Sequence, residues 1–378
     1  MRIHQTALSH TADDARFMAL ALSLGRRGLG NAWPNPAVGA VVVRDDGEGP
    51  RIVGRGWTQP GGRPHAETEA LDRAGPAARG ATLYVTLEPC SHHGKTPPCV
   101  DAIIAAGIAR VVAAIEDPNP EVAGQGHARL RAAGIVVDVG EGADEARRTH
   151  AGHIRRMREG RPHVTLKLAV SADGKAGLAG RKSAAITGEA ARDRVHLMRA
   201  RHDAILVGIG TALADDPALT CRLPGLEARS PVRVVLDSAL RLPLESRLAA
   251  TARQVPVWVL GGRSASAANE AALRSLGVEV VRVDDENGRI DLAAALRHLA
   301  TVGMTRLMVE GGPIVAGAFL EADLVDEVAL FRADKTIGPD GIDAIEGHSV
   351  DALTGSSRLR LTGQSACGVD RLETFERV

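Results

Sequence analysis

The chain has 378 residues, 44% of them hydrophobic, and its 46 lysines and arginines balance its 46 aspartates and glutamates. This length allows two domains with cores of their own, and the neutral charge offers no general attraction for nucleic acid or an anionic membrane. No apolar stretch approaches the roughly 20 residues of a membrane helix, and the first residues lack the apolar core of a signal peptide. We therefore expect a cytoplasmic protein with neither a nucleic-acid nor a membrane partner.

The first part of the chain alternates short β-branched runs with alanine-rich helical segments, which is typical of an α/β domain. Thr11 is expected to cap a helix that Gly25 or Gly28 ends, and residues 47–62 are expected to form a glycine-rich turn region. The other elements are expected, in chain order, as a strand at 37–43, a helix at 65–74, a strand at 82–87, a helix opened by residues 96–98, a strand at 109–115, a helix at 124–134, a strand at 135–139 and a charged helix at 144–158.

A second series of strands begins after the sequence Glu-Gly-Arg-Pro at 159–162, and we expect domains of residues 1–158 and 159–378. The expected strands, with helices between most of them, lie at 164–170, 204–207, 232–236, 255–260, 278–283, 306–309 and 325–330. The whole chain is therefore expected to be α/β.

The strongest chemical pattern is His-Ala-Glu at 65–67, followed by Cys90 and Cys99. One imidazole and two thiolates suit zinc, and three protein ligands leave a fourth position open for water, as in a catalytic site. Cys99 is expected in the first turn of a helix capped by Thr96, where the helix dipole favours a thiolate. Glu67 is then the natural proton carrier. Zinc-dependent base deaminases combine His-x-Glu with Pro-Cys-x-x-Cys, whereas eight residues separate the two cysteines here.

Two other interpretations of this pattern stay open. His65 and the cysteines could be ordinary buried residues, or His92 or His93 could supply a fourth ligand and make the zinc site structural. We favour a third interpretation, in which His92, His93 and Lys95 line the mouth of the pocket and contact substrate. An insertion beside a metal site is well placed for recognition.

The insertion Pro-Cys-Ser-His-His-Gly-Lys-Thr-Pro-Pro-Cys at 89–99, with Asn-Pro-Ala-Val-Gly at 35–39, resembles the bifunctional deaminase-reductase family of riboflavin biosynthesis. The resemblance implies a cytidine-deaminase-like, three-layer α/β/α domain that hydrolyses the amino group at C2 of a diaminopyrimidinone ribosylamine phosphate. It also implies that Asn35 contacts the pyrimidine, that zinc binds His65, Cys90 and Cys99, and that Glu67 shuttles protons. The family usually has a histidine where this chain has Thr58, so the substrate contact of that imidazole is in question.

The second half of the chain has two glycine-containing turns that follow predicted strands. Glu310-Gly311-Gly312-Pro313 opens a helix with proline at its first position, where backbone N–H groups can bind phosphate. Gly208 and Gly210, after the strand at 204–207, would likewise let the backbone approach a phosphate closely. Such a turn alone is more often an ordinary turn, so the spacing indicates only a nucleotide-sized ligand.

These segments and the strand and turn at 165–175 resemble segments of the reductase domain of the same family, and they follow one another in the same order. The resemblance implies a dihydrofolate-reductase-like α/β fold, reduction of the ribosyl group to ribityl with NADPH, and a homo-oligomer, either dimer or tetramer. The implied cofactor contacts are Val170, Ala185, Thr211, Asp215, Ser238, Gly311 and Gly312. The implied substrate contacts are Lys167, Ser183, Arg199, Leu219, Arg222 and Glu310, of which the two arginines offer planar forks that suit a phosphate. Some members have tryptophan where this chain has Ala185.

Four further residues match no ligand spacing. Cys221 and Cys367 are isolated in the sequence, and His196 and His202 lie in or beside a predicted helix. We expect all four to be ordinary packing or surface residues.

Overall fold

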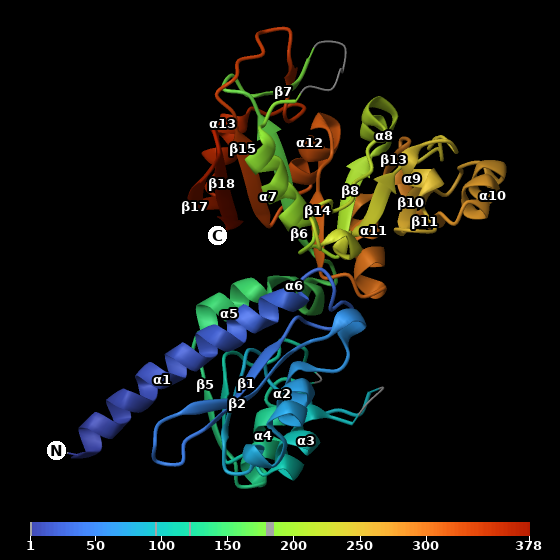
Figure 1. Ribbon diagram of the computed structural model, residues 1–378. Coiled ribbons are helices and arrows are strands. Elements are labelled where there is room, and N and C mark those ends of the chain that lie inside the picture. Colours follow the sequence, from blue (N-terminus) through green and yellow to red (C-terminus); the bar gives the residue numbers. More distant parts are fainter. Residues whose placement is uncertain (1, 95–96, 121, 179–184) are drawn as a thin grey trace. The chain divides into compact units, whose positions relative to one another are not determined.

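The computed structural model describes residues 2–94, 97–120, 122–178 and 185–378, and the chain divides into two compact units, Met1–Gly160 and Arg161–Val378 (Figure 1). Each unit contains its own large sheet. The boundary expected between residues 158 and 159 falls in the last turn of helix α6 (Ala151–Glu159).

The first unit is built on a five-stranded sheet with the order β2-β1-β3-β4-β5. The three strands β3, β4 and β5 are parallel, whereas β1 runs antiparallel to both of its neighbours. The strands are β1 (Gly39–Arg44), β2 (Arg51–Trp57), β3 (Thr82–Val85), β4 (Arg110–Ala113) and β5 (Val136–Val139). The helices are α1 (Arg2–Gly25), α2 (Ala66–Ala74), α3 (Cys99–Ala106), α4 (Gln125–Ala132), α5 (Ala143–Thr149) and α6.

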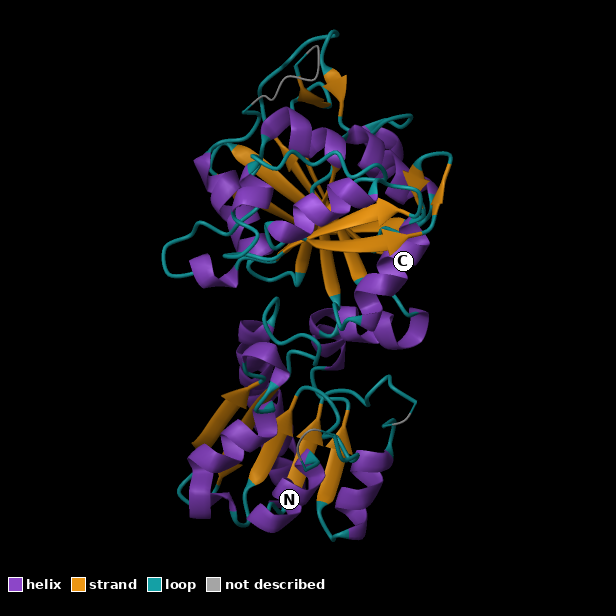
Figure 2. Cartoon of the chain, turned by 90° about the vertical axis from the view of Figure 1, so that its right-hand side faces the viewer, coloured by secondary structure: helices purple, strands orange, loops and turns teal. Residues whose placement is uncertain are grey.

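Helices cover both faces of this sheet (Figure 2). Helix α1 packs on β1 and β3 and contacts α5, while α2 packs on β1 and β2 and contacts α3, which in turn contacts α4. The buried aliphatic residues of strands and helices form one continuous core, which includes Leu22, Val41, Leu83, Ile103 and Val111. A sheet between two layers of helices is the expected three-layer α/β/α arrangement.

Strand β2 occupies part of the segment that was expected to be only a turn region. Gly54 and Gly56 made the segment look like a turn, because glycine is a poor strand former. The structure gives these glycines another role: a β-carbon at Gly54 would lie 2.1 Å from the carbonyl oxygen of Ala70, and one at Gly56 would lie 2.3 Å from that of Ala66. The two glycines therefore allow α2 to lie directly on the strand.

Three helix boundaries differ from expectation. Helix α1 begins at Arg2, ahead of the expected cap Thr11, although it ends at Gly25 as one alternative predicted. The charged helix expected at 144–158 is two helices, α5 and α6, which meet at His150, where the imidazole lies 3.1 Å from the hydroxyl oxygen of Thr86. Helix α3 begins at Cys99 with Pro98 in the cap position, so the expected cap at Thr96, a residue outside the described part, is wrong.

The second unit is built on a nine-stranded sheet with the order β11-β10-β9-β8-β14-β6-β15-β18-β17. The first seven strands in this order are parallel, and the last two form an antiparallel hairpin at one edge. Its strands are β6 (His163–Val170), β8 (Ala204–Gly208), β9 (Val232–Leu236), β10 (Val257–Gly262), β11 (Glu279–Val283), β14 (Arg306–Val309), β15 (Glu327–Arg332), β17 (Leu359–Cys367) and β18 (Asp370–Arg377). This unit is α/β, as expected.

The smaller elements complete this unit. Two short pairs of strands lie outside the large sheet, namely β7 (Lys175–Gly177) with β16 (Ile342–Asp343) and β12 (Asp285–Glu286) with β13 (Arg289–Ile290). The helices are α7 (Glu189–Arg199), α8 (Ile209–Asp215), α9 (Arg247–Ala250), α10 (Ala267–Ser275), α11 (Leu292–Thr301), α12 (Pro313–Glu321) and α13 (Val350–Thr354). All seven predicted strands are present, but neither the short pairs nor the C-terminal hairpin was predicted. None of the helices in the described part of the chain is long and apolar enough to cross a membrane.

A buried polar cluster joins helix α1 to the sheet of the first unit. Asp14 on α1 accepts a hydrogen bond of 2.7 Å from the hydroxyl of Tyr84 on β3. Arg110 on β4 donates to both oxygens of the same carboxylate, at 2.8 and 2.7 Å. The paired, largely buried geometry makes this contact worth more than a surface ion pair.

We therefore predict that Asp14→Ala lowers the free energy of unfolding by about 2–4 kcal/mol, because it leaves the Tyr84 hydroxyl and much of Arg110 without a partner. Urea denaturation followed by circular dichroism measures the change. Asp13→Ala is the control, since Asp13 pairs with Arg16 at the surface and its removal should change stability by no more than about 0.5 kcal/mol. Equal losses in the two variants would contradict the prediction.

Candidate active sites

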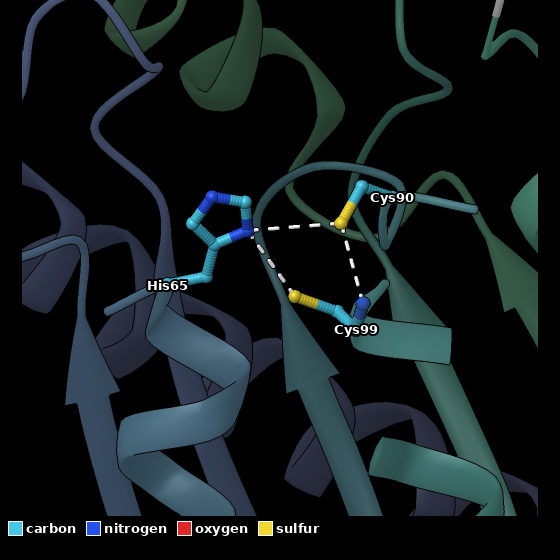
Figure 3. Close-up of side chains that lie close together, drawn as sticks. All are labelled: His65, Cys90 and Cys99. Atoms are coloured by element: carbon cyan, nitrogen blue, oxygen red, sulfur yellow. Dashed lines mark hydrogen bonds between the residues drawn. The ribbon is translucent and has the colours of Figure 1, made fainter. Parts of the chain in front are cut away.

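The three expected metal ligands come together in the first unit from three different elements (Figure 3). His65 precedes the first residue of α2, Cys99 is the first residue of α3, and Cys90 lies in the loop between β3 and α3. Close packing of α2 on β2 holds His65, and the backbone N–H of Cys99 donates a hydrogen bond of 3.3 Å to the sulfur of Cys90.

The separations within this cluster fit a zinc ion. His65 Nδ1 lies 3.2 Å from the sulfur of Cys99 and 3.7 Å from that of Cys90. Tetrahedral zinc with bonds of about 2.0–2.3 Å requires ligand atoms about 3.5 Å apart. A hydrogen bond from Cys99 lowers the pKa of the Cys90 thiol to about 4, and the same contact raises the pKa of Cys99. The contacts among these three side chains therefore favour the thiolate form of Cys90, which is the form that binds zinc.

Neither histidine of the insertion joins this cluster. His92 and His93 are exposed, and the group of ligand atoms within 4.8 Å of one another contains only His65, Cys90 and Cys99 among the residues described there. A closed, four-ligand structural site therefore gains no support from the described loop. Lys95, which we expected to contact substrate, lies outside the described residues.

Glu67 is in the first turn of α2 and is buried, with 4% of its surface exposed. Burial raises the pKa of its carboxyl to about 7, against the opposing effect of the neighbouring His65. A carboxyl with this pKa can take up and release a proton near neutral pH, which suits a general acid and base.

Asn35 also lies at the metal cluster. Its side-chain amide nitrogen donates a hydrogen bond of 2.8 Å to the carbonyl oxygen of Gly62 and lies 3.1 Å from Nε2 of His65. Thr58, which replaces the histidine usual in the family, is buried, and its hydroxyl donates to the carbonyl oxygen of Pro36 at 2.9 Å and accepts from the N–H of Val38 at 3.0 Å. Thr58 therefore supports the segment that follows Asn35.

The second unit contains a cavity of about 1190 Å³. Most of the residues expected to bind cofactor or substrate line it, namely Lys167, Ala185, Arg199, Thr211, Asp215, Leu219, Ser238, Glu310, Gly311 and Gly312. Val170 and Arg222 are not in its lining, and Ser183 lies outside the described residues. A volume of this size can hold a dinucleotide together with a small molecule.

The glycine pair opens helix α12 at the wall of this cavity. The N–H of Gly312 donates a hydrogen bond of 3.1 Å to the hydroxyl of Thr211 in α8, which joins the starts of the two helices. A β-carbon at Gly311 would lie 2.6 Å from the side chain of Val315, so only glycine fits there. The first turn of α12 therefore offers backbone N–H groups to an anion in the cavity.

Three charged groups meet in the deeper part of the lining. Arg199 donates two hydrogen bonds to the carboxylate of Glu310, at 2.8 and 2.9 Å, and the ammonium group of Lys167 lies 4.0 Å from one of the Glu310 oxygens. Burial lowers the pKa of Lys167. The fork of Arg199 that we expected to face a phosphate is thus occupied by Glu310, and Arg222 is exposed beside the cavity rather than in it.

Sequence reasoning missed three arginines of the lining. Arg192 lies in α7, Arg241 follows β9, and Arg289 lies in the short strand β13. Nothing in their local sequence marks them, because the β12–β13 hairpin that brings Arg289 to the cavity was not predicted. The residues expected to be unremarkable are buried: Cys221 and Cys367 join no metal-like cluster of the described residues, and His202 bonds to the carbonyl oxygen of Met198.

Comparison with known proteins gives matches over both units. Residues 11–115 match the family described as cytidine and deoxycytidylate deaminase zinc-binding region, and residues 162–372 match the RibD C-terminal domain. The riboflavin biosynthesis protein RibD of Escherichia coli is 44% identical over 338 residues, which cover 86% of this chain and 89% of that protein. The RibD of Aquifex aeolicus is 40% identical over 96% of this chain and 98% of its own length.

Solved structures agree with these matches, and the comparisons together confirm the expected cytidine-deaminase-like fold of the first unit and the dihydrofolate-reductase-like fold of the second. Acinetobacter baumannii RibD, form 1, superimposes with a TM-score of 0.85 at 34% identity and covers 97% of this chain and 99% of its own. A diaminohydroxyphosphoribosylaminopyrimidine deaminase/5-amino-6-(5-phosphoribosylamino)uracil reductase from Thermotoga maritima superimposes with a TM-score of 0.83 at 36% identity, over 98% of this chain and all of its own.

The geometry of the cluster predicts one metal ion per chain. Cys99→Ala removes one of three ligands, so we expect zinc content after dialysis to fall from about one ion per chain to well below half an ion. Elemental analysis of the purified protein measures it. Cys221→Ala is the matched control, because Cys221 is a buried cysteine outside the cluster. Full zinc content in Cys99→Ala, or equal loss in both variants, would contradict the assignment.

Proposed function

This chain belongs to the RibD family of riboflavin biosynthesis proteins, which combine a deaminase with a reductase, and from that premise we propose which of its residues serve each reaction. The first unit is the zinc-dependent deaminase and the second is the reductase. The convergence of His65, Cys90 and Cys99 beside buried Glu67 is the observation that carries the first assignment.

The deaminase reaction replaces an amino group of the pyrimidine by an oxygen from water. His65, Cys90 and Cys99 would hold the zinc ion, which would supply Lewis-acid activation of a water molecule. Glu67 takes a proton from that water and delivers it to the departing amino group, which leaves as ammonia. Asn35, beside His65, binds the pyrimidine, and His92 and Lys95 contact the substrate from the insertion.

The reductase reaction adds two hydrogens to the ribosyl group of the deaminated product and yields the ribityl side chain. NADPH supplies the hydride, and the protein supplies orientation and charge. Thr211, Gly311 and Gly312 bind the cofactor phosphates, with Val170, Ala185, Asp215 and Ser238 as further cofactor contacts. Lys167, Arg199, Glu310, Leu219, Arg222 and Ser183 contact the substrate.

The substrate of each step is a small phosphorylated pyrimidine: the diaminopyrimidinone ribosylamine phosphate for the deaminase, and its deaminated product for the reductase. Four free cysteines fit a reducing compartment, which supports a cytoplasmic location. A homo-oligomer, dimer or tetramer, stays a prediction.

The decisive experiment follows product masses. The zinc-loaded protein is given the diaminopyrimidinone ribosylamine phosphate, and we expect exchange of NH for O without NADPH and a further gain of two hydrogens only with NADPH. Glu67→Gln should keep its zinc but deaminate about 10²–10⁴-fold more slowly, because the proton carrier is lost. Its reduction of previously deaminated substrate should be normal.

Two outcomes would contradict this proposal. A wild-type protein that leaves the substrate unchanged, although zinc is bound, would overturn the function as a whole. A Glu67→Gln variant that deaminates at the wild-type rate would overturn the role of Glu67 alone.

We further propose that the reductase prefers NADPH to NADH. The two cofactors differ by one phosphate, which cationic side chains can recognise. Arg241 and Arg289 are exposed in the lining near Ser238, whose carbonyl oxygen accepts a hydrogen bond of 3.0 Å from Gly262 at the end of β10. Strand β10 also contacts β13, which carries Arg289. The ends of β9, β10 and β13 thus gather two cations at one end of the cavity.

We predict that the double variant Arg241→Ala/Arg289→Ala lowers kcat/KM for NADPH about 10- to 100-fold and leaves kcat/KM for NADH within about twofold. Each lost charge-assisted hydrogen bond costs about 1.5–3 kcal/mol when buried, and the cost is smaller here because both arginines are exposed to solvent. Steady-state kinetics with both cofactors measure the ratio. Arg253→Ala, an exposed arginine of the same unit outside the cavity lining, is the control. Equal losses with NADPH and NADH would show that the arginines do not read the extra phosphate.

A further inference from the structure

Glu88 is a buried acidic residue that neither proposed reaction uses. It lies after β3 and directly before Pro89-Cys90, and none of its side chain is exposed. Nδ1 of His127 lies 3.9 Å from one of its oxygens, but burial lowers the pKa of this imidazole and so favours its neutral form. A salt bridge therefore does not explain why a carboxyl group is buried here.

Four backbone N–H groups explain it. Those of Asp117 and Gly124 donate to Oε2 at 3.1 and 2.9 Å, and those of Gly126 and His127 donate to Oε1 at 2.8 and 3.2 Å. The last two belong to the first turn of α4, where backbone N–H groups have no partner within the helix. Both oxygens of Glu88 thus act as acceptors, and the negative end of the residue faces a helix N-terminus.

These bonds act on the backbone that carries the metal ligand Cys90. On one side, α4 lies against Pro89, because a β-carbon at Gly126 would come within 2.2 Å of the Pro89 carbonyl oxygen. On the other side, the N–H of Val100 in α3 donates to the carbonyl oxygen of Cys90 at 3.2 Å. Cys90 is therefore held between the starts of two helices, and Glu88 secures the α4 side.

A second metal site is the competing interpretation. Glu88, Glu116 and His127 have ligand atoms within 4.8 Å of one another. The oxygens of Glu88 already accept four N–H groups, whose positive ends would face any cation placed there. The arrangement suits an anchor for backbone, not a metal.

We propose that Glu88 is a positioning residue of the zinc site. It sets the place of the Cys90 sulfur relative to His65 and Cys99 by tying the start of α4 and the backbone of Asp117 and Gly124 to the ligand loop. The inference rests on the proposed zinc-dependent deaminase function. It predicts that a change confined to the Glu88 carboxylate alters metal binding, although Glu88 touches neither metal nor substrate.

Glu88→Gln tests this with almost no change of shape. The glutamine replaces one acceptor oxygen by an NH₂ group that faces two N–H donors. We expect zinc affinity, measured by competition with a chromophoric chelator, to fall about 10- to 100-fold, as for other groups that orient metal ligands. Cobalt(II) substituted for zinc should show shifted visible bands, which report ligand geometry. The reductase turnover of the same chain should stay within about twofold of wild type, since Glu88 lies in the other unit.

Glu116→Gln is the matched control, because it makes the same chemical change at an exposed neighbour in the same cluster. It should bind zinc and cobalt like the wild type. Wild-type affinity and an unchanged cobalt spectrum in Glu88→Gln would overturn the inference and leave the deaminase function intact. A wild-type protein that binds zinc but does not deaminate would instead contradict the proposed function.

A measurement on the wild type covers the case in which the Glu88→Gln first unit fails to fold. Coupling between two sites is reciprocal, so zinc binding should stabilise the bonds that Glu88 accepts. Amide hydrogen exchange at Gly126 and His127 should slow when zinc is added to the metal-free protein, relative to amides of the second unit. Unchanged exchange at both amides would overturn the proposal.

Discussion

Helix α2 lies so close to strand β2 that no side chain fits between them, and the metal-binding part of the first unit depends on this contact. Gly54 and Gly56 provide the space, because β-carbons there would overlap carbonyl oxygens of the helix. The contact fixes the start of the helix, which carries His65 and Glu67. A side chain at either glycine would push α2 from the sheet and move His65 away from the two sulfurs.

Both units place the starts of helices at the ends of strands, where negative groups are favoured. In the first unit, the start of α3 supplies Cys99 and an N–H bond to Cys90, and the start of α4 receives Glu88. In the second unit, the starts of α8 and α12 meet at the cavity wall. Unpaired N–H groups and the helix dipole favour a thiolate, a carboxylate or a phosphate at such places. The two units thus share one electrostatic feature of the backbone.

The cluster of His65, Cys90 and Cys99 and the parallel strands could be predicted because their signals are local. His65, Cys90 and Cys99 are recognised by residue type and spacing, and buried strands by runs of β-branched residues. Strand β2 could not be predicted, because its glycines serve packing against a distant helix. The hairpin of β17 and β18 was missed because β17 is mostly exposed and lacks clear apolar alternation. The pairing of Arg199 with Glu310 joins residues 111 positions apart, and no local pattern shows it.

The buried group of Lys167, Arg199 and Glu310 contains two cations and one anion. Protonated Lys167 would give this group a net positive charge, which is costly to bury. An anionic ligand in the cavity would offset that charge and stabilise the folded form by mass action. A metal ion at His65, Cys90 and Cys99 would stabilise the first unit instead. The two units of one chain would then resist unfolding through different ligands, so the supply of one ligand would protect one unit without protecting the other.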